Sequence, residues 1–288
     1  MLYSISHQQW QADRDDQAAA ALEMGNIVYF PNLAFALLPE EMPLISSRLA
    51  DGLAKNISFN SQTQTLKGIA GNALETHAIN NLMQRYAQYS TQLLQTLIPQ
   101  YTQALQIGRT SLRLVEIAGR RAASYKKDDT RLHVDAFPAS PTQGLRILRV
   151  FCNINPNGKP RLWHVGESFE KVAATFLPRI RRSVPGSARL LHALKITKSR
   201  RSYYDHIMLH MHDGMKKDMC YQKSVQHTEI AFPPASTWMV YTDQVSHAAL
   251  AGQHLLEQTF YLPVHVMQEP ARSPLRVLEK MTNTQLVQ

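Results

Sequence analysis

The sequence predicts an α+β protein whose core is a double-stranded β-helix, or jelly roll. Residues 110–270 contain many short β-rich runs separated by turn residues, as in an all-β core. Residues 1–109 show a helical spacing of apolar residues, and an insertion at about 170–227 combines helical runs with a basic cluster. We therefore expect a mainly helical N-terminal region packing on the core, a jelly-roll core with a basic, partly helical insertion, and a C-terminal tail over residues 271–288.

One long helix of the N-terminal region is indicated by apolar residues that recur at steps of three and four. These residues are Leu82, Tyr86, Tyr89, Leu93, Leu97 and Tyr101. The spacing places them on one face of an amphipathic helix, which we expect to pack against the sheet. Residues 56–72 are rich in Ser, Asn, Gln and Gly, and they predict a loop before this helix.

Strands of the core are predicted where β-branched and aromatic residues cluster between turn signals. These runs cover residues 111–117, 145–153, 238–242 and 258–264. Residues 137–141, between the first two runs, contain two prolines and cannot form a helix. The pattern is that of short antiparallel strands joined by loops.

Length and composition exclude several classes of protein. A chain of 288 residues can bury a substantial core as one large domain or as one domain with an appended helical part. Cys152 and Cys220 show no paired spacing, so we expect no disulfide framework and no zinc ribbon, in keeping with a reducing cytosol. Residues 1–16 lack the apolar core of a secretory signal, and the longest apolar stretch, 27–38, is too short to span a bilayer.

The strongest functional signal is the segment Arg131-Leu132-His133-Val134-Asp135. A histidine and an aspartate two positions apart on an extended strand point their side chains the same way. His247, 114 positions downstream and after another β-rich run, can complete a set of two imidazoles and one carboxylate on one face of a metal. This set, with the opposite face open, is typical of non-haem Fe(II) oxygenases. We predict His133, Asp135 and His247 as metal ligands and as the catalytic centre.

Other interpretations of the histidines remain open. A bare His-x-Asp match arises by chance in a chain with 12 histidines, so a surface His and Asp in a turn is the plain alternative. His206 and His210 share a helix face in the insertion, but Ile207 stands where a hydrolytic zinc helix needs a glutamate. The chain also lacks the Gly-x-Ser-x-Gly elbow of a serine hydrolase and the glycine loops that hold nucleotide phosphates.

An oxygenase of this class most often uses 2-oxoglutarate as co-substrate, and the far carboxylate of that molecule requires a cation. The common position for this cation, about ten residues beyond the distal histidine, holds Glu257 and Gln258 here. We predict Arg149 as the replacement, because an arginine buried on a largely apolar strand face requires an anion; a structural ion pair is the alternative. Arg113 is the second candidate, and Asn153 either hydrogen-bonds the co-substrate or caps the strand end.

Positive charge is concentrated in the insertion. Residues 171–227 hold 12 Lys and Arg against 3 acidic residues, a net charge of +9 that equals that of the whole chain. Such clusters attract polyanions, among them nucleic acid, anionic lipid head groups and phosphorylated glycolipids, although a solvated basic face is the plain alternative. We predict Lys195, Lys198, Arg200 and Arg201 as substrate-binding residues.

Several stretches of the chain, including the His133 to Asp135 motif, resemble the Kdo hydroxylase family. They are residues 128–138, 146–151, 153–156, 160–170, 215–218 and 221–222. These enzymes are the Fe(II)/2-oxoglutarate/O2-dependent 3-deoxy-D-manno-oct-2-ulosonic acid (Kdo) 3-hydroxylases of Gram-negative bacteria. The resemblance implies iron at His133, Asp135 and His247, and hydroxylation at C3 of a Kdo sugar of Kdo2-lipid A to form Ko. We also expect ascorbate to stimulate the reaction.

The resemblance gives the basic insertion a role. Kdo carboxylates and lipid A phosphates are densely anionic, so we expect residues 195–201 to bind the head group and to hold the protein, as a peripheral protein, at the cytoplasmic face of the inner membrane. We expect no nucleic-acid partner and infer no protein partner. The alternatives are an oxygenase of the same class that acts on nucleic acid and a non-enzymatic anion-binding jelly roll.

Overall fold

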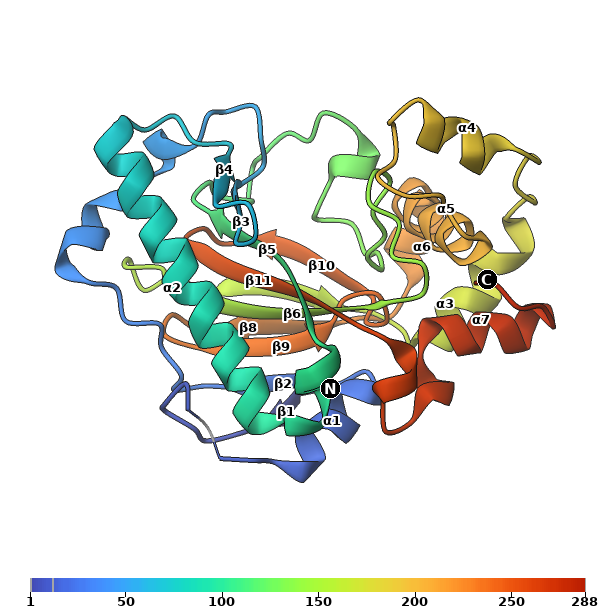
Figure 1. The fold of residues 1–288 in the computed structure, drawn as a ribbon, viewed down its shortest axis with the longest axis horizontal. Coiled ribbons are helices and arrows are strands. Elements are labelled where there is room, and N and C mark those ends of the chain that lie inside the picture. Colours follow the sequence, from blue (N-terminus) through green and yellow to red (C-terminus); the bar gives the residue numbers. More distant parts are fainter. Residues whose placement is uncertain (1, 12, 288) are drawn as a thin grey trace.

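The computed structural model describes residues 2–11 and 13–287, and the strands of this part form two sheets (Figure 1). The strands are β1 (Leu2–Ser4), β2 (Ile27–Phe30), β3 (Ile57–Asn60), β4 (Thr65–Lys67), β5 (Gln106–Arg113), β6 (Arg146–Asn153), β7 (Arg161–Val165), β8 (Thr228–Phe232), β9 (Thr237–Tyr241), β10 (His247–Ala251) and β11 (Leu255–Leu262). The large sheet has the order β1-β2-β9-β6-β11-β5-β3-β4, and the small sheet has the order β10-β7-β8. Neighbouring strands are antiparallel except for the pair β1 and β2.

The helices are α1 (Asp16–Glu23), α2 (Ala73–Leu97), α3 (Phe169–Phe176), α4 (Ser187–Ala193), α5 (Tyr203–Lys217), α6 (Met219–Ser224) and α7 (Pro274–Thr282). Helix α2 crosses one face of the large sheet, as the amphipathic spacing predicts (Figure 1). It begins at a capping box in which Asn72 and Glu75 satisfy each other's backbone N–H groups. Its buried Tyr86 hydroxyl donates to the carbonyl oxygen of Val150 on β6, at 3.0 Å.

The alternation of side chains along β6 separates two layers of the core. Leu148, Val150 and Cys152 belong to the large hydrophobic cluster, which also holds the buried face of α2. Phe151 points the other way and packs on Trp163 of the small sheet, with ring centroids 5.1 Å apart. Two facing sheets with a covering helix confirm the predicted jelly-roll fold class.

The predicted insertion lies between β7 and β8 and is helical over much of its length. Its helices α3 to α6 gather with α7 at one end of the sheets (Figure 1). No helix in residues 2–11 and 13–287 combines the length and the apolar character needed to cross a bilayer.

The N-terminal region does more than pack on the core, because it contributes β1 to β4 to the large sheet. The loop predicted over residues 56–72 is wrong in part, since β3 and β4 form a hairpin there and β3 pairs with β5. Ile57 and Phe59 are both buried. The alternation of these apolar residues with polar ones therefore favours a strand, although the composition of the segment is that of a loop. The expected boundary at residues 109 and 110 falls inside β5.

Candidate metal centre and its cavity

His133, Asp135 and His247 come together in the structure. The segment before Asp135 runs beside β10, where the backbones of His133 and His247 exchange hydrogen bonds of 3.0 and 2.9 Å. The backbone N–H of Asp135 donates to the carbonyl oxygen of Thr242, at 2.8 Å, and this bond holds the carboxylate end of the motif. One ligand atom from each of the three side chains lies within 4.8 Å of the others, and all three residues are buried. Among the described residues, no other His, Cys, Asp or Glu side chains form such a group of three.

Both imidazoles present the same nitrogen to the site. The Nδ1 atom of His133 lies 2.8 Å from the carbonyl oxygen of Arg131, and that of His247 lies 2.8 Å from the carbonyl oxygen of Val245. A carbonyl oxygen can only accept, so each Nδ1 carries the hydrogen and each Nε2 keeps its lone pair for a metal. The Nε2 atom of His133 lies 3.7 Å from Oδ1 of Asp135, a separation that one ion can bridge.

The protonation states also suit a cation. Burial lowers the pKa of His133 well below 6.5, and burial likewise lowers the pKa of His247, so both rings are neutral at pH 7. Burial alone would raise the pKa of Asp135, but the nearby guanidinium of Arg149 outweighs this effect and holds the pKa below its ordinary value. Two neutral imidazoles and one carboxylate fit an octahedral Fe(II) that keeps open positions.

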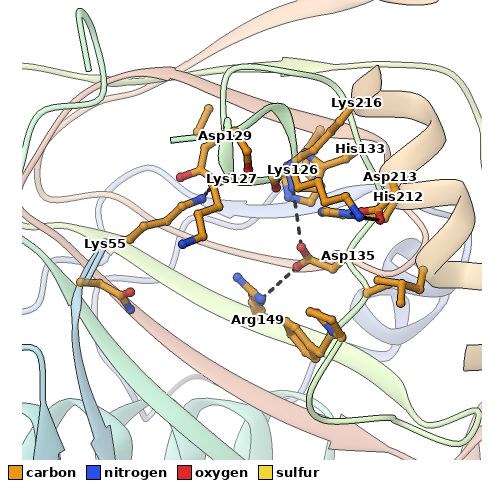
Figure 2. A pocket seen from close by; sticks show the side chains of 18 of the residues that line it. Lys55, Lys126, Lys127, Asp129, His133, Asp135, Arg149, His212, Asp213 and Lys216 are labelled. Carbon is orange, nitrogen blue, oxygen red and sulfur yellow. Dashed lines mark hydrogen bonds and ion pairs between the residues drawn. The ribbon is translucent and has the colours of Figure 1, made fainter. Parts of the chain in front are cut away.

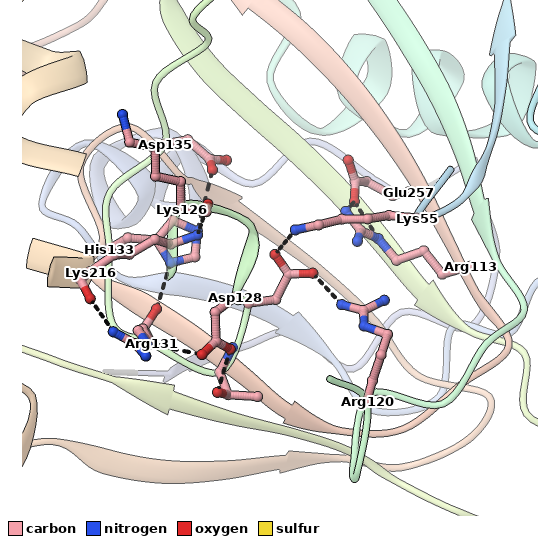
Figure 3. Close-up of polar contacts among 12 residues, drawn as sticks. Lys55, Arg113, Arg120, Lys126, Asp128, Arg131, His133, Asp135, Lys216 and Glu257 are labelled. Atoms are coloured by element: carbon pink, nitrogen blue, oxygen red, sulfur yellow. Dashed lines mark hydrogen bonds and ion pairs between the residues drawn. The ribbon is translucent and has the colours of Figure 1, made fainter. Parts of the chain in front are cut away.

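The helical insertion fixes the metal-binding segment from the other side. Gln222 on α6 clamps the peptide of Leu132, because its Oε1 accepts from the Leu132 N–H and its Nε2 donates to the Leu132 carbonyl oxygen, both at 2.9 Å. The guanidinium of Arg131 bridges Asp128 and the carbonyl oxygen of Lys216 (Figure 3). The sequence analysis assigned no role to Gln222, and only its contacts in the fold identify it as a positioning residue.

A cavity of about 630 Å³ opens beside the three ligands. Its wall combines the metal group with residues of the sheets, of the insertion and of the short 3-10 helix η4 (Tyr125–Lys127). Many of the side chains around the cavity are cationic, and Figure 2 shows lysines on two sides of His133 and Asp135. The site can therefore hold a metal together with anionic ligands.

Arg149 and Arg113 line this cavity, but carboxylates already neutralise both of them. Arg149 forms ion pairs with Asp135, at 3.0 Å, and with Glu257, at 2.9 Å. Arg113 pairs with the other oxygen of Glu257, at 2.7 Å (Figure 3). The structural ion pair named as the alternative for Arg149 is thus present. Its assignment to the co-substrate stays a prediction, as does that of Arg113.

Asn153 forms its side-chain hydrogen bonds at the end of β6. Its side-chain amide nitrogen donates to the carbonyl oxygens of Lys159 and Phe232, at 3.1 and 2.9 Å, and its amide oxygen accepts from the N–H of Asn155. The side chain does not line the metal cavity, and these bonds use its polar atoms in holding the turn after β6. These contacts fit the capping role named as the alternative, and the assignment of Asn153 to the co-substrate stays a prediction.

Arg161 and Trp163 are two further residues of the site that the sequence analysis missed. They are two apart on β7, they line the metal cavity, and the ring of Trp163 stacks on His247 with centroids 5.1 Å apart. Arg161 is only 3% exposed, donates to the carbonyl oxygen of Gly252 at 2.8 Å, and has no carboxylate partner within the described residues. Its Nε–H and the Trp163 indole N–H are buried without an acceptor. Burial, reinforced by the charge of Arg113, lowers the pKa of Arg161 to about 9.

The predicted basic residues lie along the rim of the site. Arg201 lines the metal cavity, and Lys198 lines an adjoining cavity of about 670 Å³. Lys195 and Arg200 are exposed. The rival histidine His206 lies with Nε2 2.8 Å from the carbonyl oxygen of Arg181, and it belongs to no group of metal ligands in the described part of the chain.

Comparisons with known proteins agree with this geometry. The profile of a family described as 3-deoxy-D-manno-oct-2-ulosonic acid (Kdo) hydroxylase matches residues 6–285. No curated protein matches the chain in a sequence search.

Several solved structures are similar over nearly the full length. One is the Kdo hydroxylase KdoO, described as a non-haem Fe(II) α-ketoglutarate-dependent dioxygenase, in complex with α-ketoglutarate (2-oxoglutarate) and Fe(III). It is 46% identical with a TM-score of 0.95, and the match covers 99% of this chain and 97% of that chain. KdoO in complex with cobalt(II) gives a TM-score of 0.96, and in complex with succinate and Fe(III) a TM-score of 0.95, at the same identity and coverage.

Proposed function

The chain belongs to the Kdo hydroxylase family, and from this membership we propose that it adds a hydroxyl group at C3 of a Kdo sugar of Kdo2-lipid A, forming Ko in lipopolysaccharide biosynthesis. It is an Fe(II)- and 2-oxoglutarate-dependent dioxygenase that acts on a Kdo-containing substrate. The observation that carries this function is the group His133, Asp135 and His247, with its lone pairs turned towards one point beside a cationic cavity.

Iron, O2 and 2-oxoglutarate supply the chemistry, since oxidative decarboxylation of the co-substrate provides the oxidant that converts a C–H bond into C–OH. The protein's own task is to hold the ligands, to orient the sugar and to exclude water. Gln222 and the backbone bridge to β10 fix the ligand segment. We expect ascorbate to stimulate turnover by keeping the iron ferrous.

Arg161 is our proposed anchor for the far carboxylate of 2-oxoglutarate. Its guanidinium is buried in the cavity wall and lacks an anion, whereas Arg149 has two carboxylate partners. A guanidinium binds a carboxylate through two parallel hydrogen bonds, and the unused indole N–H of Trp163 adds a further donor on the same strand face. Arg149 then keeps Asp135 ionised and oriented for the metal.

A direct test is mass spectrometry of Kdo2-lipid A incubated with the enzyme, Fe(II), ascorbate and 2-oxoglutarate. We expect a gain of one oxygen on a Kdo unit and an equal amount of succinate. DNA or RNA, added as a competitor, should reduce the yield of hydroxylated lipid no more than a simple salt at the same ionic strength does. Succinate formed in equal amounts with and without the lipid, and no oxygen on the sugar, would contradict the proposed substrate.

We also propose that the protein binds peripherally to the cytoplasmic face of the inner membrane, through α4 and its flanks. Four large apolar side chains there are between 53% and 72% exposed, namely Val184, Leu190, Leu194 and Ile196. Exposed basic residues stand between and beside them, among them Arg182, Arg189 and Lys195. Apolar side chains within a basic segment match the interface of an anionic bilayer. The apolar side chains enter the head-group region, and the basic side chains bind lipid phosphates. The same segment leads to Lys198 and Arg201 at the cavity rim.

Vesicle flotation tests this surface. We expect the double substitution Leu190→Gln with Leu194→Gln to weaken binding to vesicles that contain anionic phospholipid, and we expect high salt to weaken the wild type. The matched control is Leu53→Gln with Leu74→Gln, because these two leucines are more exposed but lie outside the insertion. Equal flotation of the two double variants would refute the assignment of the membrane surface to α4.

A further inference from the structure

Lys216 is a second buried cation that lacks a carboxylate partner in the metal cavity. It lies in the last turn of α5, is 2% exposed, and stands beside His133 in the cavity wall (Figure 2). Its ammonium group donates one hydrogen bond, to the carbonyl oxygen of Lys126 at 3.2 Å. Within residues 2–11 and 13–287, no carboxylate comes close enough to form an ion pair with it.

The neighbouring carboxylates are already occupied. Asp129 is bound by Lys55, at 2.5 Å, and by Arg120, at 2.8 Å. Asp213 is bound by Lys126, at 2.6 Å. An ammonium group has three hydrogens to donate, and one carbonyl contact leaves the charge without compensation in a buried site. Burial accordingly lowers the pKa of Lys216 to about 8, although nearby carboxylates act against this effect.

The backbone of Lys216 is tied to the metal ligands. Its carbonyl oxygen accepts from the guanidinium of Arg131, at 2.7 Å, and Arg131 is two residues before His133. Gln222, which clamps Leu132, also donates to the carbonyl oxygen of Met215 at 2.8 Å. These hydrogen bonds tie the last turn of α5 to the ligand segment and so fix the backbone of Lys216 beside the metal ligands.

The chemistry of the sugar places its carboxylate close to the metal. A 3-deoxy-2-ulosonic acid carries its carboxylate at C1 and its methylene at C3, and both are bonded to C2. Whatever binds the carboxylate must therefore lie beside the metal if the C3 methylene is to face the metal. Two buried cations of the described residues have no carboxylate partner: Arg161 is on the sheet, and Lys216 is on the insertion that carries the basic rim.

We propose that Lys216 binds the carboxylate of the Kdo sugar and thereby places the adjacent methylene at the metal. This assignment rests on the proposed function and adds to it the group that selects an acidic sugar. A neutral hexose would leave the buried ammonium group uncompensated, so Lys216 also provides specificity against neutral sugars. The division of labour is then one cation for each anionic ligand, Arg161 for the co-substrate and Lys216 for the substrate.

The test compares Lys216→Met with Lys217→Met, which makes the same chemical change one position along α5 on an exposed side chain that does not line the cavity. We expect Lys216→Met to lower kcat/KM for Kdo2-lipid A by about 30-fold or more, the effect of removing one partner of a buried charged pair. The KM for 2-oxoglutarate and the visible band of the anaerobic Fe(II)–2-oxoglutarate complex should stay at the wild-type values. The control should match the wild type throughout.

A substrate analogue whose Kdo carboxylate is converted to the carboxamide tests directly whether Lys216 binds that carboxylate. The wild type should discriminate strongly between acid and amide, and Lys216→Met should hardly discriminate. An intact Fe(II)–2-oxoglutarate band in Lys216→Met shows that the variant is folded. If Lys216→Met retains the wild-type preference for the acid, or instead raises the KM for 2-oxoglutarate, the assignment is wrong while the proposed function stands. If the wild type hydroxylates neither substrate, both fail.

Discussion

Replacing Arg161 with methionine tests whether this buried cation binds the co-substrate or stabilises the fold. Burial and the charge of Arg113 lower the pKa of Arg161 to about 9, far below that of an exposed guanidinium, so the charged form costs on the order of 5 kcal/mol in the folded protein. Because the folded pKa lies below the unfolded one, the buried charge destabilises the ligand-free protein at every pH below about 9. The penalty shrinks as the pH rises above about 9.

The substitution also removes a stabilising contact, the hydrogen bond to the carbonyl oxygen of Gly252. A hydrogen bond from a charged group contributes about 1.5–3 kcal/mol, which is less than the burial penalty. We therefore expect ligand-free Arg161→Met to melt at the wild-type temperature or a few degrees higher. Loss of the anion partner should weaken 2-oxoglutarate binding by about 2–5 kcal/mol, or roughly 30- to 5000-fold.

Thermal melts with and without Co(II) and 2-oxoglutarate, together with calorimetric titration, measure both effects. The matched control is Arg149→Met, which deprives Asp135 and Glu257 of their cation and should lower the free energy of unfolding by about 3–5 kcal/mol. The reasoning is refuted if Arg161→Met melts well below the wild type and still binds 2-oxoglutarate with wild-type affinity. That result would make Arg161 a structural residue.

Three further predictions concern the ligands, the pH dependence and the turn beside Arg161. His133→Ala should lose the visible band that Fe(II) and 2-oxoglutarate give together without oxygen, and a retained band would remove His133 from the ligand set. The metal-free protein should lose stability as the pH falls below 6.5, because burial holds the pKa of His133 and His247 below that value and the unfolded chain then binds more protons than the folded one. Thermal melts in the presence of a chelator, at pH values between about 7.5 and 5, measure how the melting temperature depends on pH. Gly252→Ala should cost about 1–3 kcal/mol in urea unfolding, since φ is +108° and the new Cβ would lie 3.0 Å from Cδ of Arg161; a neutral effect would show that the turn can relax.

Sequence reasoning could predict the metal group because its geometry is mostly local. Two residues at spacing i and i+2 on extended backbone face the same way whatever the fold, so His133 and Asp135 need only one partner from a distance. His247 follows the β-rich run that becomes β9, and its place at the start of β10 brings it opposite His133. The burial of Arg149 followed from the same alternation, as its neighbour Phe151 packs towards the small sheet.

The partners of the arginines could not be predicted in the same way. Glu257 lies opposite Phe151 in the register of β11 with β6, and it reaches Arg149 and Arg113 from that position. The sequence shows an acidic residue near the place where many relatives carry the anchoring cation, but it does not show which arginines this residue will neutralise. Strand register across three strands decides that question, and register is a property of the whole sheet.

The same reasoning explains why Arg161 and Lys216 escaped notice although both belong to stretches that resemble the family. A cationic side chain indicates an anionic ligand only when the fold buries it and places no carboxylate beside it. Neither its burial nor its partners can be predicted from the spacing of nearby residues in the sequence. In the folded protein the cavity cations divide into two kinds. Arg149 and Arg113 form ion pairs with carboxylates, whereas Arg161 and Lys216 have no carboxylate partner among the described residues, and for this reason we propose them as the groups that bind the anionic ligands. Our proposals for the two anionic ligands therefore rest on buried charges without a carboxylate partner, and such charges can be identified only after every ion pair of the fold has been assigned.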